Sequence, residues 1–276
     1  MYRLKEGAVM SVNGIWRNSY GSVMSLKQER DGRIYGSYQS TTGSTGTYYV
    51  LGYADTRDQT PERGQSLALS IFWHSIGNEP ADPSWHWVSG QGGQLLEEGP
   101  ERKLLLMHDM VATAAFPGQN GIGRHIDKLI FTPDPGAAVV HVEPALGLIE
   151  RAGTKGQSAD FSGEWVDSND PSIRIRPRLL DARFGFTQAN LSLDGFSCAA
   201  WGFIDSHTRQ DDCGLQAISF SALLDPSSGE TVSLSGWLDL ATGAASLTLF
   251  RNRGTSPALS YTQTCVDQLR FVRAKG

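Results

Sequence analysis

The amino-acid sequence predicts an all-β protein built from two tandem domains. Apolar stretches are short and bounded by turn residues, many of them alternate with a period of two, and helical periodicity is scarce. The second half of the chain also repeats the first half in the same order. With 276 residues, 39% of them hydrophobic, the chain is long enough for two domains that each bury a core.

The strands are predicted from stretches in which apolar and polar residues alternate. Because successive side chains of a strand point to opposite faces, this alternation is typical of strands that cover a core on one side. The clearest examples in the first half are Arg33–Tyr38, Tyr48–Tyr53, Leu67–Trp73 and Leu104–His108. Many short strands separated by turns indicate a β-barrel or a β-sandwich.

The internal repeat rests on five pairs of similar segments. They are Gly14–Asn18 with Gly163–Asp167, Asp31–Ile34 with Asp181–Phe184, Gly52–Asp55 with Gly202–Asp205, Val88–Gly90 with Leu234–Gly236, and Ile126–Phe131 with Val266–Phe271. Proline and glycine punctuate the connection that follows the first unit. We therefore predict domains at residues 1–135 and 159–276, joined by a linker at residues 136–158.

The charge balance argues against nucleic acid and anionic membranes as partners. The formal net charge is −5, whereas such partners require clustered lysine and arginine. The densest basic run, Arg174, Arg176, Arg178 and Arg183, alternates like the solvated outer face of a strand. No apolar run approaches the roughly 20 residues of a membrane span, and the first residues lack the apolar core of a secretory signal. We expect a cytoplasmic protein.

The three cysteines do not form a metal-binding pattern. Cys198, Cys213 and Cys265 are odd in number, and none belongs to a CxxC motif. We expect reduced thiols, no metal and no cofactor. A single bridge between Cys198 and Cys213 on neighbouring strands is the alternative.

The first domain resembles the avidin and streptavidin family. Gly14–Ser22 (GIWRNSYGS) is similar to the family's first strand, Gly36–Ser40 to its second, Ile71–Trp73 to its fifth and Ser89–Gln91 to its sixth. The resemblance covers roughly residues 13 to 132, and the second domain is identified mostly through the repeat. It implies two eight-stranded antiparallel up-and-down barrels that contact each other within the chain, a small-molecule pocket at an open end, and a homo-oligomer.

The resemblance also implies a ligand, biotin or an analogue, and residues that bind it. Asn18, Ser22 and Tyr38 match the positions that hold the ureido oxygen. A buried carbonyl acceptor must be fully hydrogen-bonded to offset its desolvation, so three donors there make physical sense. Ser40 matches an acceptor for a urea N–H, and Trp73 matches a hydrophobic wall.

Further binding positions carry over less regularly. Ser44 lies in a loop where the family places a lid, and Ser84 keeps an expected hydroxyl. Leu106 and His108 fall where the family has Trp and Leu. Asp127 stands two residues away from the family's closing Asp, on the same strand face as the apolar residues that follow it.

The directions of the Trp85, His86 and Trp87 side chains are predicted from the spacing of this motif to Ser89–Gln91. That spacing puts His86 at a position where the family has Thr and turns it into the barrel. Both tryptophans then point outward, and we expect the companion barrel or a second chain to cover them. A shift of one residue would reverse all three assignments.

The second barrel is expected to be mainly a packing partner. Asp167 and Ser172 keep the first two polar positions of the pocket, but Thr187 stands in place of the Tyr, Ala189 of the Ser and Ala222 of the Trp. An ionised Asp167 cannot donate a hydrogen bond to an acceptor oxygen.

Three functions follow from these residues. The first is a binding protein whose first barrel holds biotin or a related compact, polar-headed ligand. The second is a lyase, cyclase or isomerase in which His86, His108 and Asp127 exchange protons inside the barrel. The third is a structural or assembly module with degenerate pockets. The fold by itself does not separate them.

Overall fold

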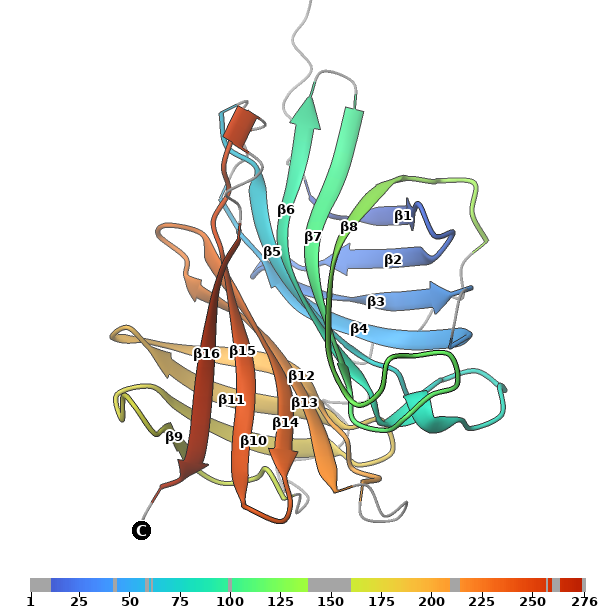
Figure 1. Ribbon diagram of the computed structural model, residues 1–276. Helices are drawn as coiled ribbons and strands as arrows, with labels where there is room; N and C mark the ends of the chain where they lie inside the picture. Colours follow the sequence, from blue (N-terminus) through green and yellow to red (C-terminus); the bar gives the residue numbers. More distant parts are fainter. Residues whose placement is uncertain are drawn as a thin grey trace, which may run out of the picture.

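A computed structural model shows two closed antiparallel barrels of eight strands each (Figure 1). It describes residues 11–41, 44–57, 60, 62–98, 101–138, 160–208, 214–256, 258–259 and 264–274. Within these residues no helix has the length and apolar character needed to cross a membrane. The all-β class and the two tandem eight-stranded barrels are therefore confirmed.

The first barrel runs in simple up-and-down order. Its strands are β1 (Gly14–Asn18), β2 (Val23–Gln28), β3 (Arg33–Ser40), β4 (Gly46–Ala54), β5 (Gln65–Phe72), β6 (Val88–Glu98), β7 (Glu101–Ala112) and β8 (Gly123–Pro133). A single 3₁₀ turn, η1 (Pro83–His86), lies between β5 and β6. Pairing of β1 with β8 closes the barrel, so no strand edge is left unpaired.

The second barrel has the same order. Its strands are β9 (Trp165–Asp167), β10 (Arg174–Asp181), β11 (Phe186–Leu193), β12 (Phe196–Ile204), β13 (Leu215–Asp225), β14 (Glu230–Asp239), β15 (Ala244–Asn252) and β16 (Thr264–Arg273). Pairing of β16 with β9 closes it. The repeated segments at the two ends of each unit take equivalent places, since Asn18 pairs with Phe131 as Asp167 pairs with Phe271. Val88–Gly90 begin β6, whereas Leu234–Gly236 lie in the middle of β14. Trp16 of β1 and Trp165 of β9 are both almost fully buried. Residues 139–159 lie outside the described part of the chain, so the linker boundaries stay a prediction.

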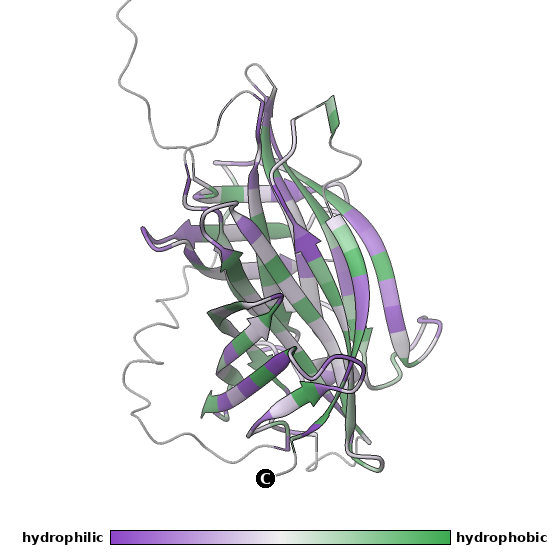
Figure 2. Ribbon diagram, turned by 90° about the vertical axis from the view of Figure 1, so that its left-hand side faces the viewer, coloured by the Kyte–Doolittle hydropathy of each residue, from purple (hydrophilic) through white to green (hydrophobic). Residues whose placement is uncertain are grey.

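The period-two pattern places one face of most strands toward a barrel core. Hydrophobic and hydrophilic residues alternate visibly along the strands in Figure 2. On β10 the odd-numbered apolar residues are buried, whereas Arg174, Arg176 and Arg178 are exposed. The predicted solvated face is confirmed. Cys198 and Cys265 carry free thiols, and Cys213 lies outside the described residues.

The two barrels pack against each other through β4–β7 of the first and β12–β15 of the second. These strands are buried on both faces, because their outer faces meet between the barrels, where aromatic and aliphatic residues form a third core. Phe72 lies 6.1 Å from Phe203 and Tyr49 lies 5.0 Å from Phe186, measured between ring centroids. The two barrels therefore share a buried interface made by the outer faces of these strands.

Polar residues within this interface are paired across it. The hydroxyls of Ser70 and Ser221 lie 2.8 Å apart, and Ser235 Oγ donates to Asp109 Oδ2 at 2.7 Å. The guanidinium of Arg124 reaches over from β8 and donates to the backbone carbonyl of Ser246 at 2.6 Å. Pairing of this kind offsets the cost of burying polar groups.

Close approach of the barrels depends on Gly90 in β6. A Cβ atom built there would lie 2.5 Å from Ser235 Oγ and 2.6 Å from Ser233 Oγ. Gly90→Val is therefore expected to overpack the interface and to lower the free energy of unfolding by about 1–3 kcal/mol, measured by urea denaturation. Gly214→Val is the matched control, since no atom lies within 4 Å of its Cβ position. Equal stability of the two variants would contradict this packing.

Candidate functional site

A pocket of about 250 Å³ opens at one end of the first barrel. Its walls are two tryptophans, a methionine, a serine and the loop that follows β7. The lining residues are Ser44, Trp73, Trp87, Met110, Phe116, Pro117, Gly118 and Gln119. The pocket is thus aromatic at its sides, with Ser44 and Gln119 as its polar lining residues.

Asn18, Ser22 and Tyr38 meet inside this barrel, as predicted. All three are at least nine-tenths buried, and the hydroxyl of Tyr38 faces both other side chains. Tyr38 also packs edge-on against Trp73, with ring centroids 5.9 Å apart. Burial raises the pKa of Tyr38, while the nearby side chains of Ser22 and Asn18 lower it less, so the phenol stays protonated and can donate.

The orientation of Asn18 is set by its own turn. Its Oδ1 accepts from the backbone N–H groups of Tyr20 at 3.1 Å and Ser22 at 3.0 Å. The amide nitrogen Nδ2 is then left buried without a hydrogen-bond partner among the described residues. A buried donor without a partner costs about 1–3 kcal/mol, which a bound acceptor would recover.

A second polar chain crosses the interior. Ser89 Oγ accepts from Trp73 Nε1 at 2.8 Å and lies 2.7 Å from His108 Nε2. Deeper along β6, Gln91 is buried with neither its amide nitrogen nor its amide oxygen hydrogen-bonded to a described residue. The interior therefore holds unused donors and an unused acceptor beyond those of Asn18.

His108 is uncharged at neutral pH. Burial lowers the pKa of His108 to about 4, although the nearby negative charge of Asp127 raises it in part. His108 and Asp127 are direct neighbours across β7 and β8. As a neutral imidazole, His108 offers hydrogen bonds rather than charge to the interior.

Three hydroxyl groups form a further cluster at the mouth of the pocket. Ser44 Oγ lies 2.8 Å from the hydroxyl of Tyr48 and 2.5 Å from Ser84 Oγ. All three residues are buried. Burial raises the pKa of Tyr48 to about 12, so its hydroxyl also remains a donor. Ser44 lines the pocket, while the neighbouring residues 42 and 43 lie outside the described part.

The prediction for Trp85, His86 and Trp87 was wrong. Asp82 caps η1 by accepting from the backbone N–H of Ser84 at 2.8 Å, and Pro83 supplies the fixed φ of its first residue. The segment is therefore a turn, and strand alternation does not apply to it.

Because of this turn, the indole of Trp87 lines the pocket in place of the predicted imidazole of His86. Trp87 lines the pocket and donates from Nε1 to the backbone carbonyl of Ala114 at 2.8 Å. His86 instead points to the second barrel, where its Nδ1 lies 2.7 Å from Asp205 Oδ2. Trp85 is half-buried and packs on His74, with ring centroids 4.3 Å apart.

The three residues predicted to exchange protons do not assemble. His86 lies between the barrels, whereas His108 lies inside the first one. Asp127 keeps the strand face of Leu129, but it is exposed at the rim and accepts from the hydroxyl of Tyr20 at 3.0 Å. The acid–base cluster that the enzyme alternative needs is therefore absent from the described first barrel.

The other predicted site residues lie in the interior without reaching the described pocket wall. Leu106 belongs to the apolar core of the first barrel, and Ser40 is buried at the end of β3.

Sequence reasoning missed the loop after β7. Phe116 packs edge-on against Trp87 at 5.5 Å, and Gly118 and Gln119 complete this side of the pocket. Its glycines and lack of periodicity are typical of a loop, but nothing local indicated that it covers the pocket. The aromatic Phe116 within a polar loop was the one usable signal.

The core of the second barrel is filled by side chains. Phe161 stacks on Trp165 at 4.7 Å and lies 6.5 Å from Phe220, all three being almost fully buried. Asp167 accepts from the backbone N–H groups of Asn169, Asp170 and Arg270, so its carboxylate holds a turn. The hydroxyl of Ser172 donates to Asp170 Oδ1 at 2.7 Å. Both polar positions carried over from the first pocket are thus structural.

Comparison with known families agrees with this geometry. Residues 6–104 match the Avidin family, a range that includes Asn18, Ser22, Tyr38, Trp73 and Trp87. Within the described residues no group of three or more His, Cys, Asp or Glu side chains is arranged to hold a metal ion. Over residues 6–104 the first barrel is similar to the Avidin family and has an avidin-like small-molecule-binding fold, and with the second closed barrel the chain is an avidin-like tandem.

Proposed function

We propose that the protein binds a compact, uncharged-headed small molecule, biotin or a close analogue, in the first barrel. The observation that carries this proposal is the buried amide nitrogen of Asn18, which has no hydrogen-bond partner among the described residues and lies beside the donors Ser22 and Tyr38. Three donors around one point fit a ureido or amide oxygen, which can accept several hydrogen bonds at once.

The pocket walls support a flat apolar body next to that head. Trp73 and Trp87 offer indole surface, and Phe116 closes one side. Aromatic walls with a few fixed polar groups are typical of small-molecule sites. A rigid bicyclic ligand would bury most of its surface against these rings.

The electrostatics of the interior favour a neutral head group. His108 is uncharged because burial lowers its pKa to about 4, and Gln91 and Ser89 are neutral polar groups. A charged head would lose its hydration without meeting an opposite charge, at a large energetic cost. Any carboxylate of the ligand would therefore lie toward the mouth, near the hydroxyl groups of Ser44 and Ser84.

Titration calorimetry of the full chain with biotin tests the proposal. We expect saturable binding with one site per chain. Tyr38→Phe removes one donor to the ligand oxygen and should weaken binding about 10-fold, the usual value of one hydrogen bond. Asn18→Ala should weaken it by at least as much. The predicted homo-oligomer can be measured on the same samples by sedimentation.

Tyr35→Phe is the matched control for Tyr38→Phe. Tyr35 lies on the same strand but on the opposite face, where its hydroxyl donates to Glu29 at 2.9 Å. This variant should bind as the wild type does. Absence of saturable binding by the wild type, or equal losses in the two tyrosine variants, would overturn the proposal.

A further inference from the structure

The wall of the first pocket is attached to the second barrel at His86. Nδ1 of His86 lies 2.7 Å from Oδ2 of Asp205, and both side chains are buried. Asp205 is itself fixed, because its Oδ1 accepts from the backbone N–H of His207 at 2.8 Å and its Oδ2 accepts from Thr208 Oγ1 at 2.8 Å. A charge-assisted contact to a rigid carboxylate orients the imidazole and the turn that carries it.

That turn supplies one wall of the pocket, Trp87, and contacts a second lining residue, Ser44. Two residues before His86, Ser84 contacts Ser44 at the mouth, and the residue after it, Trp87, is a pocket wall. The backbone N–H of Trp87 donates to the carbonyl of Ser84 at 2.9 Å. A displacement of His86 would therefore move a hydroxyl group and an indole of the pocket together.

The loop after β7 is tied to the same point. The hydroxyl of Thr113 donates to the backbone carbonyl of His86, and Trp87 Nε1 donates to the carbonyl of Ala114. Phe116, which closes the pocket, follows within this loop. The β5–β6 connection and the loop after β7 are thus tied together at one short turn.

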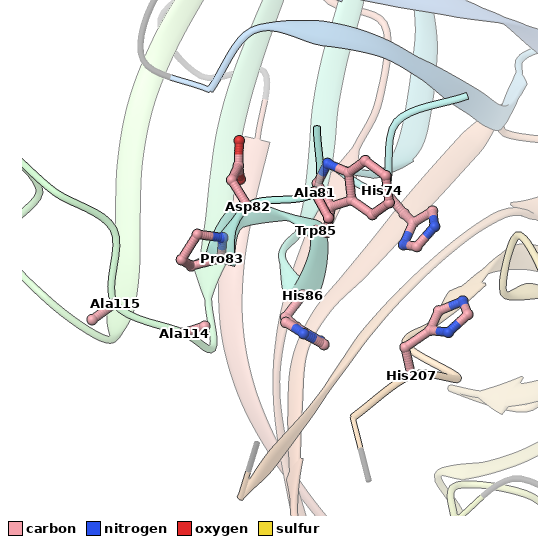
Figure 3. Close-up of a pocket in the computed structure, with 9 residues that line it drawn as sticks. All are labelled: His74, Ala81, Asp82, Pro83, Trp85, His86, Ala114, Ala115 and His207. Atoms are coloured by element: carbon pink, nitrogen blue, oxygen red, sulfur yellow. The ribbon is translucent and has the colours of Figure 1, made fainter. Parts of the chain in front are cut away.

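One side of this turn borders a cavity. The cavity, of about 640 Å³, lies between the barrels and is lined by His74, Trp85, His86 and His207 among others. Figure 3 shows the His86 ring directed away from the strand ribbon behind it and toward the side on which His207 lies. Because open space replaces close packing on that side, the contact with Asp205 carries more of the restraint.

The second barrel reaches the pocket at one further place. Ser219 Oγ of β13 donates to the backbone carbonyl of Ser89 at 2.9 Å. The side chain of Ser89 holds Trp73 and His108 inside the first barrel. The filled second barrel thus fixes both β6 and the turn before it.

We infer that the second barrel serves as the support of the first-barrel pocket, with Asp205 and His86 as positioning residues across the barrel interface. For its effect on ligand affinity this inference rests on the proposed function. It assigns a role to a barrel whose own core is filled: it holds Ser84, Trp87 and the Phe116 loop in their ligand-binding positions.

Hydrogen exchange of the full, ligand-free chain tests the inference directly. His86→Ala should raise exchange at residues 84–89 and 113–119 about 10-fold, the effect expected when one buried hydrogen bond is lost. His86→Asn places an N–H donor near the position of Nδ1 and should restore most of the protection. Biotin affinity should fall about 10-fold in His86→Ala and recover in His86→Asn.

Ser221→Ala is the matched control, because it removes a different hydrogen bond across the same interface, the one to Ser70. It should leave exchange in both segments and biotin affinity unchanged. Wild-type exchange at residues 84–89 and 113–119 in His86→Ala would overturn the inference, as would equal effects of Ser221→Ala. Failure of the wild type to bind biotin would overturn the proposed function alone, since the exchange measurement needs no ligand.

Discussion

Phe161→Ala is expected to lower the free energy of unfolding by about 3–5 kcal/mol, measured by urea denaturation. Phe161 is fully buried in the core of the second barrel, stacked on Trp165 and close to Phe220. Its removal loses the burial of a phenyl ring and leaves a cavity among rigid strands that cannot collapse to fill it.

The same variant tests whether the phenyl ring of Phe161 fills part of the core of the second barrel. An apolar cavity of this kind binds benzene, so benzene should raise the melting temperature of Phe161→Ala and leave the wild type unchanged. Phe196→Ala is the matched control, since Phe196 is 43% exposed on the same barrel and should cost far less. Equal losses in the two variants would contradict the assignment of Phe161 as the filling residue.

Acidification is expected to destabilise the protein through His108. Burial lowers the pKa of His108 to about 4 from an ordinary value of 6.5, so between these values the unfolded chain binds a proton that the folded chain excludes. The free energy of unfolding should therefore fall as the pH drops from 6.5 to 4. The shift corresponds to a loss of roughly 3 kcal/mol.

His108→Gln should remove this part of the pH dependence while keeping a polar side chain next to Ser89. The comparison is made on urea-denaturation curves at several pH values between 4 and 7. His125→Gln, a change on the neighbouring strand at the barrel rim, leaves His108 in place and should keep the wild-type dependence. If His108→Gln retained the full pH dependence, the interior would not be excluding a charged imidazole.

Much of the fold was predictable because it depends on the local alternation of apolar and polar residues along each strand. Tyr38 and Leu67–Leu69 lie in strands whose alternation is visible without any partner, and closing such strands buries their apolar face. The repeat of Gly14–Asn18 at Gly163–Asp167 predicted a second barrel, since equal patterns bury equal faces. The polar group of Asn18, Ser22 and Tyr38 was predicted instead from the resemblance of Gly14–Ser22 and Gly36–Ser40 to the avidin family, and the structure brings these three side chains together.

The segment Trp85-His86-Trp87 shows where such prediction ends. Its alternating residue types resemble those of a strand, but Asp82 caps a 3₁₀ turn that starts at Pro83. In this turn successive side chains do not point to opposite faces as they do in a strand. The partner of His86 is Asp205, 119 residues away on another barrel. No local pattern encodes a contact of that separation.

The amino-acid sequence by itself determined the all-β class and the two repeated units, because strand periodicity and turn residues act over a few neighbouring positions. The closed barrel and the polar group of Asn18, Ser22 and Tyr38 were predicted from the resemblance to the avidin family. Only the tertiary structure decided that Trp87 enters the pocket, that His86 leaves it for Asp205, and that Phe161 fills the second barrel. These three outcomes depend on packing and hydrogen bonding between residues far apart in the chain, which exist only once both barrels have closed.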